Sequence, residues 1–123
     1  LRDSVYPILA SNSFSIIEDP KISINKIPEF VSFLEKNGVP SFGHIGVGIL
    51  HPCFKIDEEE KIKNMFMQVE SLDGSVTGEH GIGLLKKEFI DVEFAKNFRA
   101  LKEKHDPLNL LNKGKVIDIK PKK

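Results

Sequence analysis

The sequence predicts an α+β domain in which a small antiparallel sheet is covered on one side by helices and followed by a helical C-terminal segment. Two kinds of segment indicate this class. Alternating apolar and polar residues, typical of half-buried strands, occur at 13–19 and 41–51, whereas apolar residues at helical spacing occur at 26–37 and 57–72. Because strand and helix alternate before the last helices follow, we expect one layer of each.

The first half of the chain contains two predicted strands and two predicted helices. The strand at 13–19 ends at Pro20, and the helix at 26–37 ends at Gly38, a glycine suited to the left-handed position after a helix. The strand at 41–51 is expected to place Ile45, Val47 and Ile49 on one face. The helix at 57–72 is expected to begin with Asp57 as its N-cap.

The second half of the chain is predicted to be helical. Residues Leu84–Ile90 and Val92–Lys104 have helical patterns, and the second pattern ends near Asp106-Pro107. Leu108–Leu111 is expected to add a short helical turn. Aromatic residues at helical core positions are predicted to pack in the interior: Phe30, Phe33, Phe66, Phe89 and Phe94.

Composition excludes two classes of partner. Eighteen Lys and Arg balance eighteen Asp and Glu, so a nucleic-acid-binding surface is not expected. No apolar run approaches the roughly 20 residues of a membrane span. The single cysteine, Cys53, is typical of a small buried residue in a reducing compartment. With no visible signal peptide and no initiator Met, we expect a cytoplasmic location and an origin in a longer polypeptide.

Four short motifs are the best candidates for a functional site, because they hold all four histidines and seven of the nine glycines. The motifs are Gly43-His44-Ile45-Gly46-Val47-Gly48-Ile49-Leu50-His51-Pro52, Gly78-Glu79-His80-Gly81-Ile82-Gly83, His105-Asp106-Pro107 and Asn112-Lys113-Gly114-Lys115.

His44 and His51 are candidate metal ligands, with Glu79 as the third. Their odd separation puts the two histidines on opposite faces of a regular strand, but a turn or bulge at glycines 46–48 would bring them together. Two neutral imidazoles and a carboxylate form a common open site for a divalent ion. The alternative is that the histidines are separate hydrogen-bonded residues, and spacing alone favours this alternative.

His80 lies beside Glu79 in a loop before a predicted helix. Because adjacent side chains point different ways, Glu79 could bind a metal while His80 reaches a substrate. An imidazole titrates near neutral pH and suits general-base chemistry. A phosphate-binding loop is not expected, since the glycines do not follow G-x-G-x-x-G and no Gly-Lys-Ser/Thr follows.

Together, the four motifs resemble the C-terminal part of the FAD-linked oxidases, the family of the glycolate oxidase FAD subunit, D-lactate dehydrogenase and D-2-hydroxyglutarate dehydrogenase. The resemblance runs from about Ile16 to Val116. From its length, residues 1–123 are expected to form one domain. The resemblance implies that this domain is the second half of a cap with its returning C-terminal segment, and that the FAD-binding domain is absent. It also implies oxidation of a small 2-hydroxy acid, whose proton passes to a histidine and whose hydride passes to FAD.

The resemblance assigns roles by position. His44, His51 and Glu79 match the ligands of a divalent metal, zinc in some members, and His80 matches the catalytic histidine. Asn112, in an otherwise ordinary polar turn, matches the family's Asn-Pro-Gly-Lys motif near the flavin. By counting residues, Arg2 falls where an arginine of the family meets the substrate carboxylate.

The sequence departs from the family pattern at two motifs. The usual Gly-Asp-Gly-Asn appears as Gly46-Val47-Gly48-Ile49. An acid and an amide that could orient the ligating imidazoles are therefore replaced by apolar side chains. Lys113 stands where the family has proline.

The leading hypothesis is therefore the cap portion of a FAD-dependent 2-hydroxy acid oxidase or dehydrogenase, inactive alone because hydride transfer needs the cofactor. The alternative is a stand-alone binding or interaction module that keeps the fold without flavin. An unpaired sheet edge would favour self-association under either hypothesis. A metal-dependent hydrolase would use the same His-His-Glu set and be active with metal alone. An upstream flavin-binding region in the gene would support the first hypothesis, and an initiator Met before Leu1 the second.

Overall fold

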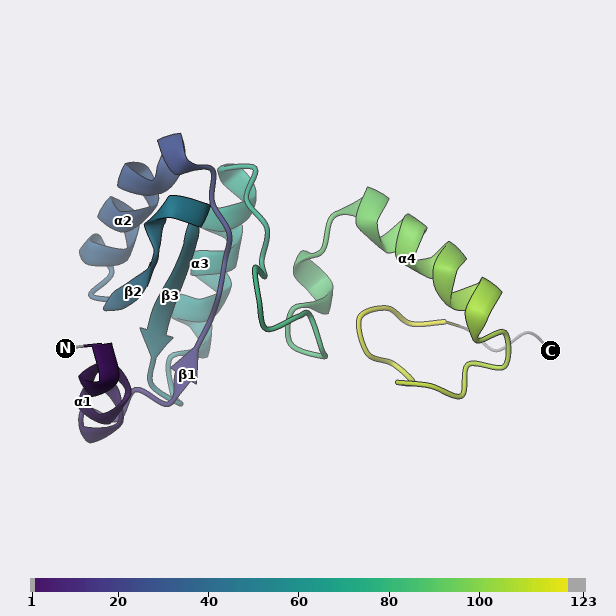
Figure 1. Cartoon of the computed structure of the whole chain (residues 1–123), viewed down its shortest axis with the longest axis horizontal. Coiled ribbons are helices and arrows are strands. Elements are labelled where there is room, and N and C mark those ends of the chain that lie inside the picture. The colour runs from purple at the N-terminus through teal and green to yellow at the C-terminus, as the bar shows by residue number, and fades with distance from the viewer. Residues whose placement is uncertain (1, 120–123) are drawn as a thin grey trace. The chain divides into compact units, whose positions relative to one another are not determined.

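A three-stranded antiparallel sheet in the order β1–β3–β2 organises the first half of the chain (Figure 1). β3 is the central strand and all of its residues are buried. β1 pairs with it at Ile16 and Ile17, opposite Phe54 and Cys53. All four residues of β2 pair with β3. The strands are β1 (Ile16–Ile17), β2 (Ser41–His44) and β3 (Ile49–Phe54).

The computed structural model describes residues 2–119, and of Arg2 only the backbone. Contacts divide the chain into two compact units, Leu1–His80 and Gly81–Lys123. The assignment of residues 1–123 to one domain stays a prediction. No helix within the described range has the length and apolar character needed to cross a membrane. The helices are α1 (Val5–Ser11), α2 (Ile27–Lys36) and α3 (Glu59–Ser71) in the first unit and α4 (Val92–His105) in the second.

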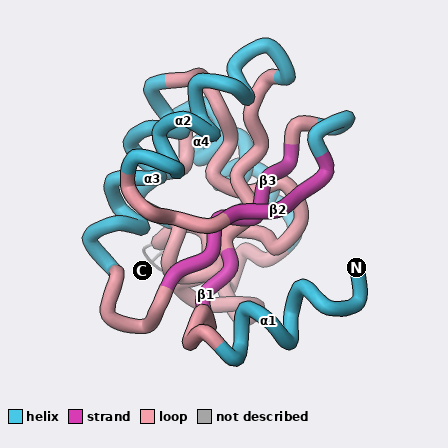
Figure 2. Tube along the Cα trace, turned by 90° about the vertical axis from the view of Figure 1, so that its left-hand side faces the viewer, coloured by secondary structure: helices cyan, strands magenta, loops and turns pink. Residues whose placement is uncertain are grey.

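Helices α2 and α3 lie on the same side of the sheet, as Figures 1 and 2 show. Side chains alternate along β3, so Leu50 and Phe54 face one way and His51 the other. Burying one large apolar side chain stabilises the fold by about 1.5–3 kcal/mol. The predicted α+β class, with a small antiparallel sheet and helices on one face, is confirmed. The most deeply buried side chains of the two helices are Phe30, Leu34, Met65, Phe66 and Val69.

The segment 41–51, predicted as one strand, is instead a hairpin. A 3₁₀ turn at Ile45–Val47 reverses the chain, and Gly48 completes the turn with a φ of +76°. A Cβ at Gly48 would lie 2.1 Å from the carbonyl oxygen of Ile22, so both space and conformation require glycine. Ile45 and Val47 are therefore exposed on the turn, and they do not share a strand face with the buried Ile49 as predicted.

Proline explains two further differences from prediction. The strand expected at 13–19 forms a ladder only in β1, because the prolines that come next along the two paired segments, Pro52 and Pro20, have no N–H. Single bonds replace the ladder: the Glu18 N–H donates to the Pro52 oxygen at 3.1 Å, and the Leu50 N–H donates to the Pro20 oxygen at 3.2 Å. The sequence patterns also do not predict α1. Its Pro7 lies in the first turn, where helical N–H groups have no intrahelical partner, so proline is tolerated there.

The helix ends agree with prediction in one case and differ in another. Gly38 follows α2 with a φ of +64°, as predicted. The N-cap of α3 is Glu58, and the assignment of Asp57 was wrong. The Glu58 carboxylate accepts hydrogen bonds from the Lys55 backbone N–H at 2.9 Å and the Lys61 ammonium at 2.6 Å. These contacts lower the pKa of Glu58, the backbone contact contributing most.

The second unit is less helical than predicted. α4 is confirmed, and the carboxylate of its N-cap, Asp91, accepts from the backbone N–H of Phe94 at 2.8 Å. The helix expected at 84–90 is only turns and a 3₁₀ segment, because Ile90 is extended (φ −81°, ψ 141°) as it leads into that cap. The helical turn expected at 108–111 does not form. Phe94 is 41% exposed and not a core residue, unlike Phe30 and Phe66.

Asp106 closes α4. Its carboxylate accepts hydrogen bonds from the ammonium of Lys102 and from the backbone N–H groups of Leu110 (2.8 Å) and Leu111 (2.9 Å). The Lys102 contact above all, and then the two N–H groups, lowers the pKa of Asp106 from 3.8 to about 2. The His105-Asp106-Pro107 motif therefore ends a helix and orders the turn that follows.

We predict that Gly48→Ala destabilises the chain by about 1–3 kcal/mol or more, because alanine is strained at positive φ and meets the Ile22 carbonyl. Gly46→Ala is the matched control in the same turn, since a Cβ there has no atom within 4 Å. Denaturant unfolding followed by circular dichroism measures both. Equal stabilities of the two variants would contradict this account of the turn.

We predict that Asp106→Asn destabilises the second unit near neutral pH but not in strong acid. Since folding lowers the pKa of Asp106, its stabilisation is present above pH 3.8 and is lost as the pH falls through about 2. Unfolding of α4, followed by its amide NMR signals, should therefore differ between wild type and variant only above this range. A difference that persists in strong acid would argue against the carboxylate as its source.

Candidate metal and catalytic site

The hairpin brings His44 and His51 to the same face of the sheet. Phe42 and His51 are directly opposed in the β2–β3 ladder, and His44 lies two residues beyond Phe42 on the same side. The two imidazole centroids are 5.9 Å apart and nearly perpendicular. The turn that the sequence left open as one alternative is therefore present, and it brings together two histidines that the spacing of a regular strand would separate.

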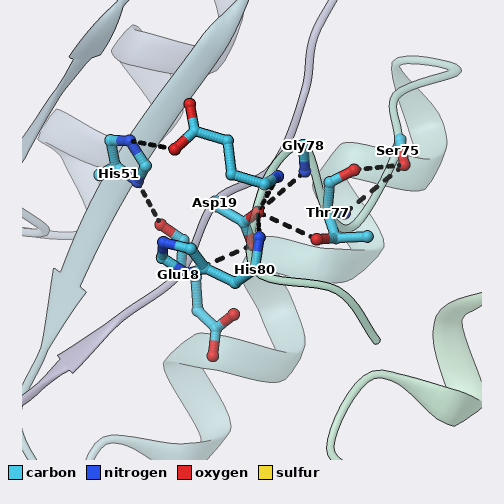
Figure 3. A network of polar contacts seen from close by, with 8 residues as sticks. Glu18, Asp19, His51, Ser75, Thr77, Gly78 and His80 are labelled. Carbon is cyan, nitrogen blue, oxygen red and sulfur yellow. Dashed lines mark hydrogen bonds and ion pairs between the residues drawn. The ribbon is translucent and has the colours of Figure 1, made fainter. Parts of the chain in front are cut away.

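His51 is the fixed member of the pair. It is 4% exposed, and its Nδ1 lies 3.2 Å from the backbone oxygen of Glu18. A carbonyl oxygen only accepts, so Nδ1 is the donor, and in the neutral imidazole Nε2 then carries the lone pair. Nε2 faces the Glu79 carboxylate, with 3.9 Å between Nε2 and Oε2 (Figure 3). A histidine that donates one ring N–H to a carbonyl and leaves the other nitrogen free is typical of metal ligands.

Glu79 and His80 come from a loop that wraps around the carboxylate of Asp19, as Figure 3 shows. One oxygen of Asp19 accepts from the Thr77 hydroxyl at 2.9 Å and from the backbone N–H groups of Gly78, Glu79 and His80 at 2.9, 2.5 and 2.7 Å. The other oxygen lies 3.7 Å from Nδ1 of His80. The sequence patterns do not single out Asp19, because an acidic residue before proline at a strand end is ordinary turn chemistry.

The donor atoms fit an open divalent site. One ligand atom each from His44, His51 and Glu79 lies within 4.8 Å of the others, and within residues 2–119 this is the sole group of three or more such side chains. Two imidazoles and a carboxylate suit zinc and similar ions and leave positions for water or substrate. His44 and Glu79 are exposed enough to adjust their side chains, whereas His51 is held in place.

Two further rings pack against His51. The ring of His80 stacks on it at 5.6 Å between centroids, and Phe42 lies against it at 4.9 Å. Tyr6 of α1 meets Phe42 edge to face at 5.7 Å. The imidazole therefore has little freedom to turn away from Glu79.

The two apolar departures from the family pattern occupy different positions. Val47 is exposed on the hairpin turn, 56% of its surface being accessible. Ile49 is buried beneath the Glu79 loop, where a Cβ at Gly78 would come within 2.9 Å of its side chain. Ile49 therefore supports the loop by packing.

The other predicted site residues lie elsewhere. The side chain of Arg2 is outside the described part of the structure. Asn112 belongs to the second unit, where it has a φ of +45°, and its backbone oxygen accepts from the Lys115 N–H at 3.1 Å. Burial raises the pKa of the Cys53 thiol to about 11, which agrees with a packing residue and not a nucleophile.

Known proteins resemble this chain in sequence. The family model for the C-terminal domain of FAD-linked oxidases matches residues 1–116. The glycolate oxidase subunit GlcD of Bacillus subtilis is 31% identical, over 84% of this chain and 26% of the relative. A probable mitochondrial D-lactate dehydrogenase of Danio rerio is 30% identical, over 82% and 24%. The D-2-hydroxyglutarate dehydrogenase of Stutzerimonas stutzeri is 28% identical, over 80% and 26%.

The chain spans about a quarter of the length of these relatives. The family match, in contrast, covers nearly all of the chain, including the hairpin and the Glu79 loop. The chain therefore belongs to the family of FAD-linked oxidase C-terminal domains.

Proposed function

We propose that this chain is the substrate-binding portion of a FAD-dependent oxidoreductase that acts on the CH–OH group of a small 2-hydroxy acid such as glycolate or D-lactate. The observation that carries the proposal is the convergence of His44, His51 and Glu79, with His80 beside them. The names of the related glycolate oxidase subunit and D-lactate dehydrogenase support this substrate class.

His44, His51 and Glu79 are proposed to hold a divalent metal such as zinc. The chemistry that such an ion supplies is Lewis acidity toward the hydroxyl and carboxylate oxygens of a 2-hydroxy acid. The structure supports this assignment because Nδ1 of His51 is hydrogen-bonded to Glu18, so that the lone pair of Nε2 in the neutral imidazole can bind a metal. The chain holds that imidazole in place and shields it from solvent.

His80 is proposed to take the hydroxyl proton as a general base. Its Nδ1 faces the Asp19 carboxylate, which leaves Nε2 for the substrate and stabilises the imidazolium that forms. Its side chain is 46% exposed and accessible to substrate. FAD would accept the hydride from the carbon that bears this hydroxyl, and the product would be a 2-oxo acid.

The remaining roles depend on parts outside the described site. Arg2 is proposed to bind the substrate carboxylate and Asn112 to approach the flavin. A FAD-binding domain of the same protein is the proposed partner. Because the cofactor carries the redox chemistry, the chain alone is expected to be inactive.

We predict that the chain retains one divalent ion after exposure to zinc or manganese and dialysis, and that His44→Ala and Glu79→Ala lose it. His105→Ala is the matched control, because His105 ends α4 in the second unit. His80→Asn should also retain the ion, since His80 acts beside the ligands. Elemental analysis gives the metal per chain. Absence of metal from the wild type, or its loss from the His105 variant, would refute the ligand assignment.

We predict that the chain combined with a FAD-binding domain bleaches the flavin absorbance when D-lactate or glycolate is added without oxygen. His80→Asn should slow this reduction by about 10²–10⁴-fold, the usual contribution of a general base. The chain without the FAD-binding domain should show no reaction. Ester hydrolysis by the metal-loaded chain alone would indicate a hydrolase instead, and flavin that stays oxidised with every 2-hydroxy acid would indicate a binding module.

A further inference from the structure

The carboxylate of Asp19 is buried in an unusual setting. Asp19 has no exposed surface, and burying a charge is costly unless hydrogen bonds compensate for it. Compensation comes from Thr77 and from three consecutive backbone N–H groups, those of residues 78–80. Successive N–H groups that converge on one anion form a backbone nest, here occupied by the protein's own side chain.

This arrangement determines where two functional side chains begin. Glu79 and His80 both leave the backbone at the residues whose N–H groups bind Asp19. From there, the Glu79 carboxylate reaches Nε2 of His51, and the His80 ring stacks on the His51 ring. The second oxygen of Asp19 also faces Nδ1 of His80.

We propose that Asp19 is a positioning residue that holds Glu79 in place for metal binding and His80 in place for catalysis. It acts through the loop at 77–80 and not as a ligand itself. The metal and catalytic parts of this inference rest on the proposed function, whereas the loop part does not. Among the three ligands, the proposal links Asp19 to Glu79 specifically, because His44 and His51 are placed by the hairpin.

Asp19→Asn isolates the role of the carboxylate. Backbone contacts at this position remain available, since Gly78 N–H also bonds to the Asp19 main-chain oxygen at 2.7 Å. The asparagine amide matches the carboxylate in size, but it is neutral and one of its two acceptors becomes a donor. The variant is therefore expected to fold, but with a less ordered loop at 77–80.

Cobalt(II) binding to the full chain tests the metal part. Asp19→Asn should weaken binding about ten- to hundredfold, the usual effect of removing a group that orients metal ligands. When Glu79→Gln is already present, Asp19→Asn should reduce the cobalt affinity little further. When His44→Ala is already present, Asp19→Asn should reduce the affinity by the same factor as in the wild type. Asp57→Asn, an exposed aspartate, is the control that should change nothing. Equal further losses in both backgrounds, or no loss in the wild-type background, would overturn the proposal.

Amide hydrogen exchange tests the loop part without metal. The N–H groups of residues 78–80 should be protected in the wild type and in Glu79→Gln, and exchange about tenfold faster or more in Asp19→Asn. If the wild type binds no cobalt, the metal assignment fails, and amide protection alone then decides whether Asp19 holds the loop. Unchanged protection in Asp19→Asn would overturn the role of Asp19 whatever the metal result.

Discussion

The hydrogen bonds to the Asp19 carboxylate are the constraint on which the site depends. They join the end of β1 to a loop about 60 residues later in the chain. Bringing together residues so far apart in the chain costs conformational entropy. The packing of the intervening α2, hairpin and α3 into one core offsets that cost. The donor atoms therefore lie together only when the first unit is folded.

Two adjacent residues at the end of β1 serve the two sides of the site. The backbone oxygen of Glu18 sets the tautomer of His51, and the side chain of Asp19 shapes the loop that carries Glu79. The Glu18 N–H donates to the oxygen of Pro52 in β3, but Pro52 has no N–H to donate in return. The irregular pairing at this point is thus tied to the site, because the Glu18 oxygen remains available to accept from His51.

Local patterns predicted the helices α2, α3 and α4, because apolar spacing and a left-handed glycine are properties of short segments. They also indicated His44, His51 and Glu79 as candidate metal ligands. They did not predict the hairpin, because alternation through residues 41–51 continues across a turn whose only strong signal is glycine. Asp19 could not be found this way, since its partners lie far along the chain and are mainly backbone N–H groups, which no side-chain pattern encodes.

The unequal burial of the three proposed ligands affects how an ion enters and leaves. His51 is enclosed, whereas His44 and Glu79 are open to solvent. An incoming hydrated ion would meet the two exposed side chains before it reaches the buried Nε2 of His51. Departure would reverse this order, so a chelator in solution could compete for the ion while it is still held by the exposed ligands. Exchange kinetics, and not only equilibrium affinity, would then determine how much of the protein is loaded.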